Sequence, residues 1–290
     1  MSGSSNRWAS RPEREAVGAA LRVAASFDFL SDDPIVLQET NNTVVWLRPH
    51  PVVAKVGKWE HSAVSLVREH RIAAALFAES APVGPPVAGT APVRDDQTGY
   101  LVTLWERLDH DARREPDPVD AGTSLRELHA ALTRFADGLP SFEESLDLAQ
   151  ATLWNDGAMK VLSASDRSLL RSAYERLRNE LKQLRYPVRP LHGEAHLGNL
   201  LVTPDGLRWI DLENVSMGPL EWDLAFLPKG SAQVFPEADE ELLTLLRTLN
   251  SARVATWCFA RWEFEELHWH GTHHLEVVRR AERAARGGGG

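Results

Sequence analysis

Four polar, chemically capable side chains, those of His192, Glu194, His196 and Asn199, lie between apolar runs in the stretch "LHGEAHLGNLLV". Three of them could act together in catalysis. They follow the pattern His192-x-Glu194-x-x-x-x-Asn199, and Asp211 follows twelve residues after Asn199. Phosphoryl transfer needs a carboxylate near the acceptor hydroxyl and oxygen ligands for the magnesium ions on the nucleotide phosphates. Asn and Asp side chains are hard oxygen donors that suit Mg²⁺. The spacing therefore predicts a base, Glu194, and a metal ligand, Asn199, on one loop, with Asp211 completing the metal site from the strand that follows.

A lysine and a glutamate earlier in the chain fit the same chemistry. Lys55 lies inside the apolar, strand-like run "PVVAKV", where an unpaired ammonium would be costly. Glu69 lies fourteen residues later, in the helical segment 61–80. In kinase-like folds a strand lysine contacts the nucleotide phosphates and pairs with a glutamate of the next helix. These two positions therefore predict a nucleotide site in the N-terminal part of the chain.

As a set, these motifs resemble the aminoglycoside phosphotransferase family, kinase-like enzymes that phosphorylate antibiotics and other small molecules. The family signature reads His-Gly-Asp-x-His-x-x-Asn and then Ile-Asp-x-Glu. The matching stretches here are "HGEAHLGN" at 192–199 and "IDLE" at 210–213. "GPLEWDLA" at 218–225 is also similar, and it places Asp223 where the family has an aspartate that braces the catalytic loop. The resemblance extends from about residue 30 to residue 270, with all motifs in the family order.

The resemblance implies that the chain binds a nucleotide, ATP or GTP, together with Mg²⁺. "TLWERL" at 103–108 would be the hinge that receives the adenine ring through backbone hydrogen bonds. The loop over the phosphates, "ETNNTV" at 39–44, has no glycine, so Asn or Thr donors would serve there. His192 is expected to act in the catalytic loop with Glu194, as a hydrogen-bonding residue that shapes it. The residues implied to bind the nucleotide are Lys55, Glu69, Asn42, Thr103, Trp105 and Arg107.

Glu194 departs from the family pattern, which usually has aspartate at this position. A glutamate keeps the carboxylate but moves it by roughly one C–C bond, and near-attack geometry tolerates a displacement of about 1 Å poorly. We therefore expect an acceptor, or a backbone, that is set slightly further away. The same departure motivates an alternative, a pseudokinase-like module that binds a nucleotide or a drug without turnover.

The elements that must position these residues form a β-rich part followed by a helical part. We predict a helix at 12–25, followed by strands at 34–38, 43–47 and 51–56 whose connections are too short for crossover helices, so their sheet should be antiparallel. A further strand is predicted at 99–105. In the helix at 61–80 the residues expected to face the core are Val64, Val67, Ala74 and Ala75. In the helix at 165–184 they are Leu169, Leu170, Ala173, Tyr174, Leu177 and Leu181.

We therefore predict an α+β, protein-kinase-like fold with two lobes. Residues 1–104 would form a small antiparallel β-rich lobe that binds the nucleotide, and 105–108 the hinge. Residues 109–286 would form a larger, mainly helical lobe with the catalytic loop and the acceptor site. The glycines at 287–290 look like a flexible tail.

Composition limits the partners of this chain. The formal net charge of −9 argues against a general nucleic-acid binder, and the apolar runs fall short of the roughly 18 residues that a membrane span needs. The N-terminus has no apolar signal-peptide core, and the single cysteine, Cys258, excludes an internal disulfide. We expect a cytoplasmic monomer or homodimer whose partner is a hydroxylated small molecule. An antibiotic is the first choice, and a sugar, an amino alcohol or homoserine is the alternative.

Other interpretations of single residues stay open. His192 and His196 are four residues apart and could bind zinc, although "HGEAH" lacks the H-E-x-x-H order of zinc proteases. Lys55 could be an edge-strand lysine that reaches water, and Glu69 an ordinary surface residue of its helix. The four histidines between 268 and 274 could bind a metal or belong to a solvated helix end.

Overall fold

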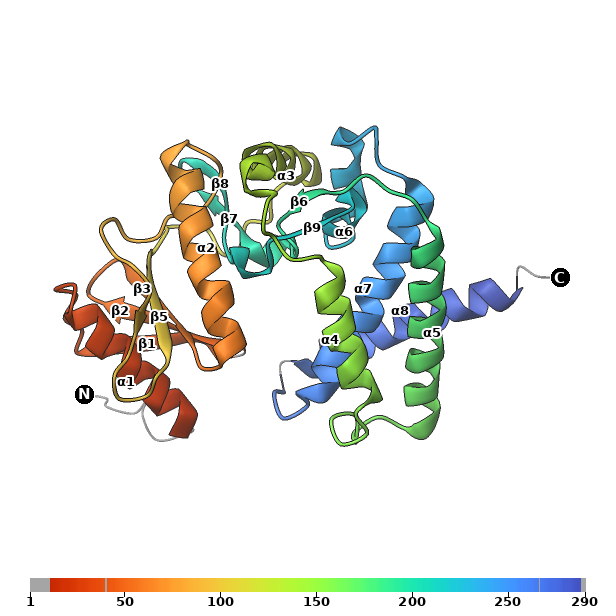
Figure 1. Cartoon of the computed structure of the whole chain (residues 1–290), viewed down its shortest axis with the longest axis horizontal. Coiled ribbons are helices and arrows are strands. Elements are labelled where there is room, and N and C mark those ends of the chain that lie inside the picture. The colour runs from red at the N-terminus through yellow and green to blue at the C-terminus, as the bar shows by residue number, and fades with distance from the viewer. Residues whose placement is uncertain (1–10, 40, 266, 288–290) are drawn as a thin grey trace. The chain divides into compact units, whose positions relative to one another are not determined.

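The computed structural model describes residues 11–39, 41–265 and 267–287, and Figure 1 shows their elements. Contacts within the chain divide it into two compact units. The first comprises Met1–Pro116 and Gly198–Asn214, and the second comprises Asp117–Leu197 and Val215–Gly290. The segment that carries Asn199 and Asp211 therefore packs with the N-terminal sheet, although helical segments flank it in the sequence. Thr40 of the expected phosphate loop and three of the four terminal glycines lie outside the described residues.

The first unit contains a five-stranded sheet in which each neighbouring pair is antiparallel, as predicted. Lys55 lies on a central strand, opposite Val44 on one neighbour and Thr103 on the other. A strand paired on both sides holds its side chains in fixed alternation across the sheet. In sheet order the strands are β1 (Asp33–Glu39), β2 (Asn42–Arg48), β3 (Val52–Gly57), β5 (Leu101–Glu106) and β4 (Val93–Arg94).

The two faces of the sheet pack against different helices. Val52, Ala54 and Val56 of β3 are buried in a core with helix α1 (Arg11–Ala25). Successive side chains of a strand point to opposite faces, so Lys55 lies on the other face, where helix α2 (Glu60–Ala78) packs against β3 and β5. The alternation of this strand therefore directs Lys55 away from the apolar core and toward α2.

The prediction of the apolar face of α2 is wrong, since Ala74 is exposed and Ala75 only partly buried. Val64 and Val67 are 61% and 47% exposed, whereas the residues that precede each of them, Ala63 and Leu66, are buried. The buried stripe continues through Glu69, which is 2% exposed, so it cannot be recognised from apolar residues alone. A glutamate on the inner face of a helix requires a partner, and Lys55 provides one.

A β-hairpin positions the segment that carries Asn199 and Asp211 within the first unit. Strands β7 (Leu200–Thr203) and β8 (Gly206–Trp209) pair with each other. The Trp209 N–H donates to the Pro82 carbonyl over 2.7 Å, and the Trp209 carbonyl accepts from the Gly84 N–H over 2.8 Å. Trp209 is fully buried, so this hairpin is fixed against the loop that follows α2.

The second unit is mainly helical, and its helices share one large apolar core. The predicted apolar face of α5 (Ala164–Gln183) is confirmed, because Leu170, Ala173, Tyr174, Leu177 and Leu181 are buried in this core and Leu169, partly buried, packs against it. Two short strands, β6 (Arg189–Leu191) and β9 (Ser216–Gly218), pair with each other. In the sequence, β6 comes directly before the expected catalytic loop, and β9 follows Asp211 and Glu213. The helices are α3 (Pro118–Leu132), α4 (Glu143–Trp154), α5 (Ala164–Gln183), α6 (Leu220–Leu224), α7 (Glu240–Ala260) and α8 (Leu267–Gly287). Within the described residues, none of the helices is long and apolar enough to cross a membrane.

Candidate functional site

Lys55 is the centre of an ion-pair cluster in the first unit. Its Nζ lies 2.9 Å from Glu69 Oε2 and 2.6 Å from Asp211 Oδ1. A third carboxylate, that of Glu213, lies 3.3 Å away. Lys55 is only 7% exposed, so its charge interacts with these groups in a poorly solvated environment. The structure therefore brings Lys55 and Glu69 together in the way the sequence predicted, and it adds Glu213.

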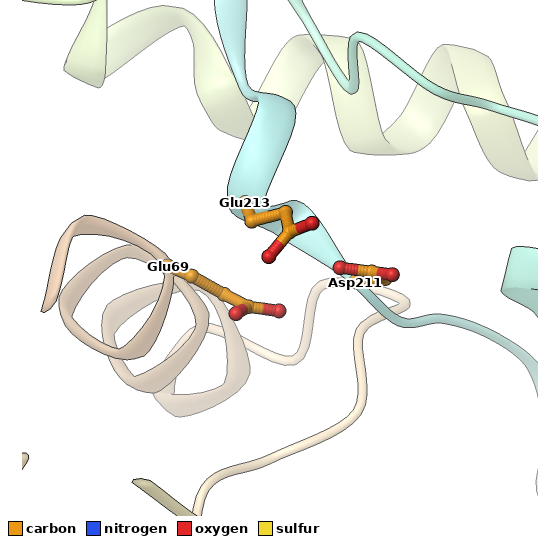
Figure 2. Close-up of side chains that lie close together, drawn as sticks. All are labelled: Glu69, Asp211 and Glu213. Atoms are coloured by element: carbon orange, nitrogen blue, oxygen red, sulfur yellow. The ribbon is translucent and has the colours of Figure 1, made fainter. Parts of the chain in front are cut away.

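Three carboxylates point toward one another around this lysine. Figure 2 shows Glu69 on α2 and Asp211 and Glu213 on the segment after β8. One oxygen from each lies within 4.8 Å of the others. Carboxylate oxygens are hard donors, and three of them at this separation fit a divalent cation such as Mg²⁺.

Asp211 does not lie on a strand, contrary to the prediction. Strand β8 ends at Trp209, and Asp211 has a φ angle of 62°. Aspartate tolerates this left-handed conformation better than most residues do. The conformation turns the chain between β8 and the short 3₁₀ helix Leu212–Asn214, so that the side chains of Asp211 and Glu213 reach the same cluster.

Burial and charge shift the pKa values of this cluster. Burial alone would lower the pKa of Lys55, but the charges of Asp211, Glu69 and Glu213 outweigh it and raise the pKa well above its ordinary value. Burial raises the pKa of Glu69 to about 8; Lys55 opposes this rise, and the charges of Asp211 and Glu213 add to it. A cation that joined the carboxylates would favour their charged forms.

A cavity of about 420 Å³ lies next to this cluster, entirely within the first unit. This volume is in the range of small-molecule and cofactor sites. Val53, Ala73, Leu201 and Ile210 contribute apolar walls, which would suit a flat aromatic base. The polar side chains that line the cavity are Gln38, Lys55, Glu69, Glu106, Arg107, His110, Asn199 and Asp211, together with the indole of Trp105.

Lys55, Glu69, Trp105 and Arg107 line the cavity, but Asn42 and Thr103, also expected at the nucleotide, do not. Thr103 is buried, and its hydroxyl accepts a hydrogen bond from the Trp105 indole N–H over 2.9 Å. Asn42 donates from Nδ2 to Glu213 Oε2 over 2.6 Å. Both residues therefore orient other members of the site. Thr103 and Trp105 are two residues apart on β5 and share a face of the sheet, whereas no sequence pattern pairs Asn42 with Glu213, 171 positions away.

The hinge-like stretch already uses two of its backbone donors. The Glu106 N–H donates to the Pro85 carbonyl over 3.1 Å, and the Arg107 N–H donates to the Pro51 carbonyl over 2.8 Å. The Arg107 guanidinium lies over the Trp46 ring, 4.1 Å from its centroid. These contacts fix the wall of the cavity at Trp105 to Arg107.

One aspartate holds the expected catalytic loop in the second unit. Asp223 is fully buried and accepts hydrogen bonds from the N–H groups of His192, over 2.7 Å, and of Gly193, over 2.8 Å. Its Oδ2 also lies 2.7 Å from Nε2 of His129. Gly193 has a φ angle of 87°, which glycine adopts without strain. Asp223 therefore lies in the position expected of the bracing aspartate.

His192 and Glu194 lie on this braced loop. His192 is fully buried, and its Nδ1 is 3.3 Å from the Glu194 N–H, so the ring contacts the backbone of the loop. Glu194 is partly buried, and Arg253 of α7 contacts it. Within the described part of the chain, neither the pair His192 and His196 nor the histidines of α8 belong to a cluster with ligand atoms close enough to hold a metal.

Three of these residues have no role that the sequence predicts. Glu213 is visible in "IDLE", but the sequence did not show that its carboxylate reaches Lys55. His110 lines the cavity, and no sequence motif marks it. Arg253 lies in a helical segment whose contacts with the loop have no sequence pattern.

Comparisons with known proteins agree with this geometry. Residues 36–271 match the model of a family described as the phosphotransferase enzyme family. The curated proteins include no match. One similar solved structure is the GDP complex of aminoglycoside 2'-phosphotransferase-IIIa, with a TM-score of 0.66 and 15% identity, covering 92% of this chain and 99% of that chain.

Two other solved structures are similar to the same extent. A microcompartment-associated aminopropanol kinase has a TM-score of 0.67 and 18% identity, covering 92% of this chain and 98% of that chain. Choline kinase LicA from Streptococcus pneumoniae has a TM-score of 0.61 and 15% identity, covering 93% and 98%. At these identities the similarity establishes the fold, and the predicted kinase-like α+β fold is confirmed.

Proposed function

Because the chain belongs to the phosphotransferase enzyme family, we propose that it transfers the γ-phosphate of ATP or GTP to a hydroxyl group of a small molecule. The observation that carries this proposal is the Lys55 cluster beside a cavity of nucleotide size. A buried lysine paired with a helix glutamate is the arrangement that kinase-like folds use to hold phosphates.

Each residue of the cluster has a role in this proposal. Lys55 contacts the nucleotide phosphates, and Glu69 fixes its ammonium. Asn199 and Asp211 would hold Mg²⁺, and the Glu213 carboxylate lies in the same cluster as Asp211. When bound, the ion neutralises charge on the phosphates. Trp105 and Arg107 contribute the wall against which the base lies.

Glu194 acts on the acceptor in this proposal. The acceptor oxygen forms a bond to the γ-phosphorus as the bond to the bridging oxygen breaks, and that electron pair leaves with the nucleoside diphosphate. The hydroxyl proton passes to the Glu194 carboxylate. His192 and Asp223 hold the loop backbone that carries Glu194. Since the transition state is loose, positioning and charge neutralisation supply most of the rate.

The acceptor we propose first is an antibiotic. The similarity to aminoglycoside phosphotransferases supports it. The second candidate is a metabolic amino alcohol, sugar or homoserine, and the similarity to aminopropanol and choline kinases favours the amino alcohol. A non-catalytic module that binds nucleotide or drug is the rival from another class, because Glu194 stands where the family usually has aspartate.

ADP release in the presence of ATP and Mg²⁺ tests this proposal, with kanamycin, choline and 1-amino-2-propanol as acceptors. Replacing Glu194 by alanine should lower kcat by roughly 10²- to 10⁴-fold, the usual contribution of a general base, while the nucleotide KM stays within about threefold of wild type. Glu282→Ala is the matched control, since Glu282 also pairs with an arginine in the second unit. Unchanged turnover in Glu194→Ala would exclude the base role, and nucleotide binding without turnover on any acceptor would favour the binding module.

A further inference from the structure

Glu194 is in contact with a cation from a distant part of the second unit. Nη2 of Arg253, on α7, donates to Oε1 of Glu194 over 3.0 Å. The two residues are 59 positions apart in the sequence. The Arg253 side chain is 8% exposed and that of Glu194 is 28% exposed. A buried arginine thus holds a carboxylate that is still partly open to solvent.

Arg253 itself has little freedom to move. Its Nε donates to Oδ1 of Asn250, one turn earlier on α7, over 3.2 Å. Its guanidinium lies 5.5 Å from the ring centroid of Trp222 and 5.4 Å from that of Phe226. Planar guanidinium groups pack against aromatic rings in this way. Arg253 is therefore a fixed donor.

The same aromatic ring also holds the loop. The indole N–H of Trp222 donates to the Gly193 carbonyl over 3.1 Å. The backbone of Gly193 and the side chain of Glu194 are thus both tied to one packed group, formed by Trp222 and Arg253. The length of the Glu194 side chain therefore decides whether its carboxylate reaches Arg253, because the loop backbone and the guanidinium are both held in place.

We propose that Arg253 is a positioning residue that holds the Glu194 carboxylate where it can take the acceptor proton. The inference rests on the function proposed above. An aspartate on the same backbone would end about 1.5 Å short, and a contact lengthened from 3.0 Å by that amount is no longer a hydrogen bond. The glutamate and Arg253 are therefore matched, which explains the departure from the family's aspartate.

A double-mutant cycle tests the match between the two residues. Wild type, Arg253→Met, Glu194→Asp and the double variant are compared by ADP release with ATP and Mg²⁺. The acceptor is whichever of kanamycin, choline and 1-amino-2-propanol gives the fastest ADP release. If none of them gives a faster release than water alone, water is the acceptor. Each single substitution should lower kcat on the order of 100-fold, with the nucleotide KM within about threefold. Because both remove the same contact, the double variant should be about as slow as the singles.

Arg178→Met is the matched control. Arg178 is as buried as Arg253 and forms ion pairs with Asp147 and Glu143 in the same unit. Its replacement should reduce stability but not kcat. If Arg178→Met lowers kcat as much as Arg253→Met does, the effect comes from general destabilisation and the proposal fails. Glu194→Asp keeps the proposal testable should Arg253→Met not fold, because wild-type kcat in Glu194→Asp would overturn it.

Two other results would overturn the proposal. A higher kcat in Arg253→Met would show that the ion pair inhibits Glu194, and independent, multiplying losses would show that the two residues act separately. Failure of the proposed function would be a separate result. It is tested by ADP release in Lys55→Met and in Asp211→Ala. If those two leave ADP release unchanged, the chain is not a kinase of this type, whatever Arg253 does.

Discussion

At the residue scale, Lys55 lies within ion-pair distance of three carboxylates, those of Glu69, Asp211 and Glu213. Burial raises the pKa of Glu69 to about 8. A divalent cation on the carboxylates would favour their charged forms, and a triphosphate would contact the ammonium. Asn42 adds a hydrogen bond to Glu213 and keeps that carboxylate at the cluster.

Lys55→Met should weaken nucleotide binding. Loss of a charge-assisted contact is worth about 1.5–3 kcal/mol, so the nucleotide KM should rise by roughly 10- to 100-fold. The three carboxylates left behind would also repel the phosphates. KM for ATP in the ADP-release assay measures the effect. Lys58→Met is the control, because Lys58 pairs with Glu39 and does not line the cavity. Equal KM values in both variants would contradict the role of Lys55.

At the scale of elements, the loop between β6 and β7 depends on α6. Asp223 of α6 accepts hydrogen bonds from two consecutive N–H groups of the loop, and His129 of α3 contacts the same carboxylate. A helix of five residues, Leu220–Leu224, thus fixes the backbone on which Glu194 lies. The positive φ of Gly193 lets both N–H groups point at one carboxylate.

Asp223→Asn should reduce both stability and turnover. The asparagine keeps one acceptor oxygen but turns an NH₂ group toward a backbone donor, so a buried N–H loses its partner. The expected loss of unfolding free energy is about 2–3 kcal/mol, measured by urea denaturation with tryptophan fluorescence. The kcat should fall as well. Asp205→Asn, in the exposed turn between β7 and β8, should change neither quantity. A wild-type unfolding free energy in Asp223→Asn would contradict the bracing role.

For the whole molecule, His274 links stability to pH. Burial, with the charges of His273, His270 and Arg253, lowers the pKa of His274 to about 4. An unfolded histidine titrates near 6.5. Between these values the unfolded chain binds a proton that the folded chain does not bind. The contribution of His274 to stability is therefore complete above about pH 6.5 and is lost as the pH falls toward 4.

His274→Leu should remove this dependence. Between pH 6.5 and 4, the unfolding free energy of wild type should fall by about 1–3 kcal/mol more than that of the variant. Urea denaturation at a series of pH values measures the unfolding free energies of both proteins. In their difference, the pH dependence contributed by the carboxylates that both proteins share cancels. Thr272→Ala, on the exposed side of the same helix, removes no charge and should keep the wild-type slope. Equal slopes in wild type and His274→Leu would contradict the prediction.

The sequence by itself determined the elements and the chemistry that is local in the chain. Strand alternation directs Lys55 away from the core, and the short connections require antiparallel pairing. The spacing of Glu194, Asn199 and Asp211 implied phosphoryl transfer, and the family is confirmed. These features depend on backbone geometry and on residues close together in the sequence, so a sequence pattern can predict them.

Only the tertiary structure decided which polar side chains meet. Glu213 reaches Asn42 across 171 positions, and Arg253 reaches Glu194 across 59. The buried stripe of α2 contains Glu69, so apolar periodicity placed the inner face of that helix one residue away from its true position. A polar residue is buried when a partner from elsewhere in the chain satisfies it, and that partner has no fixed offset in sequence. For this reason the unusual glutamate was visible from the sequence, and its arginine was not.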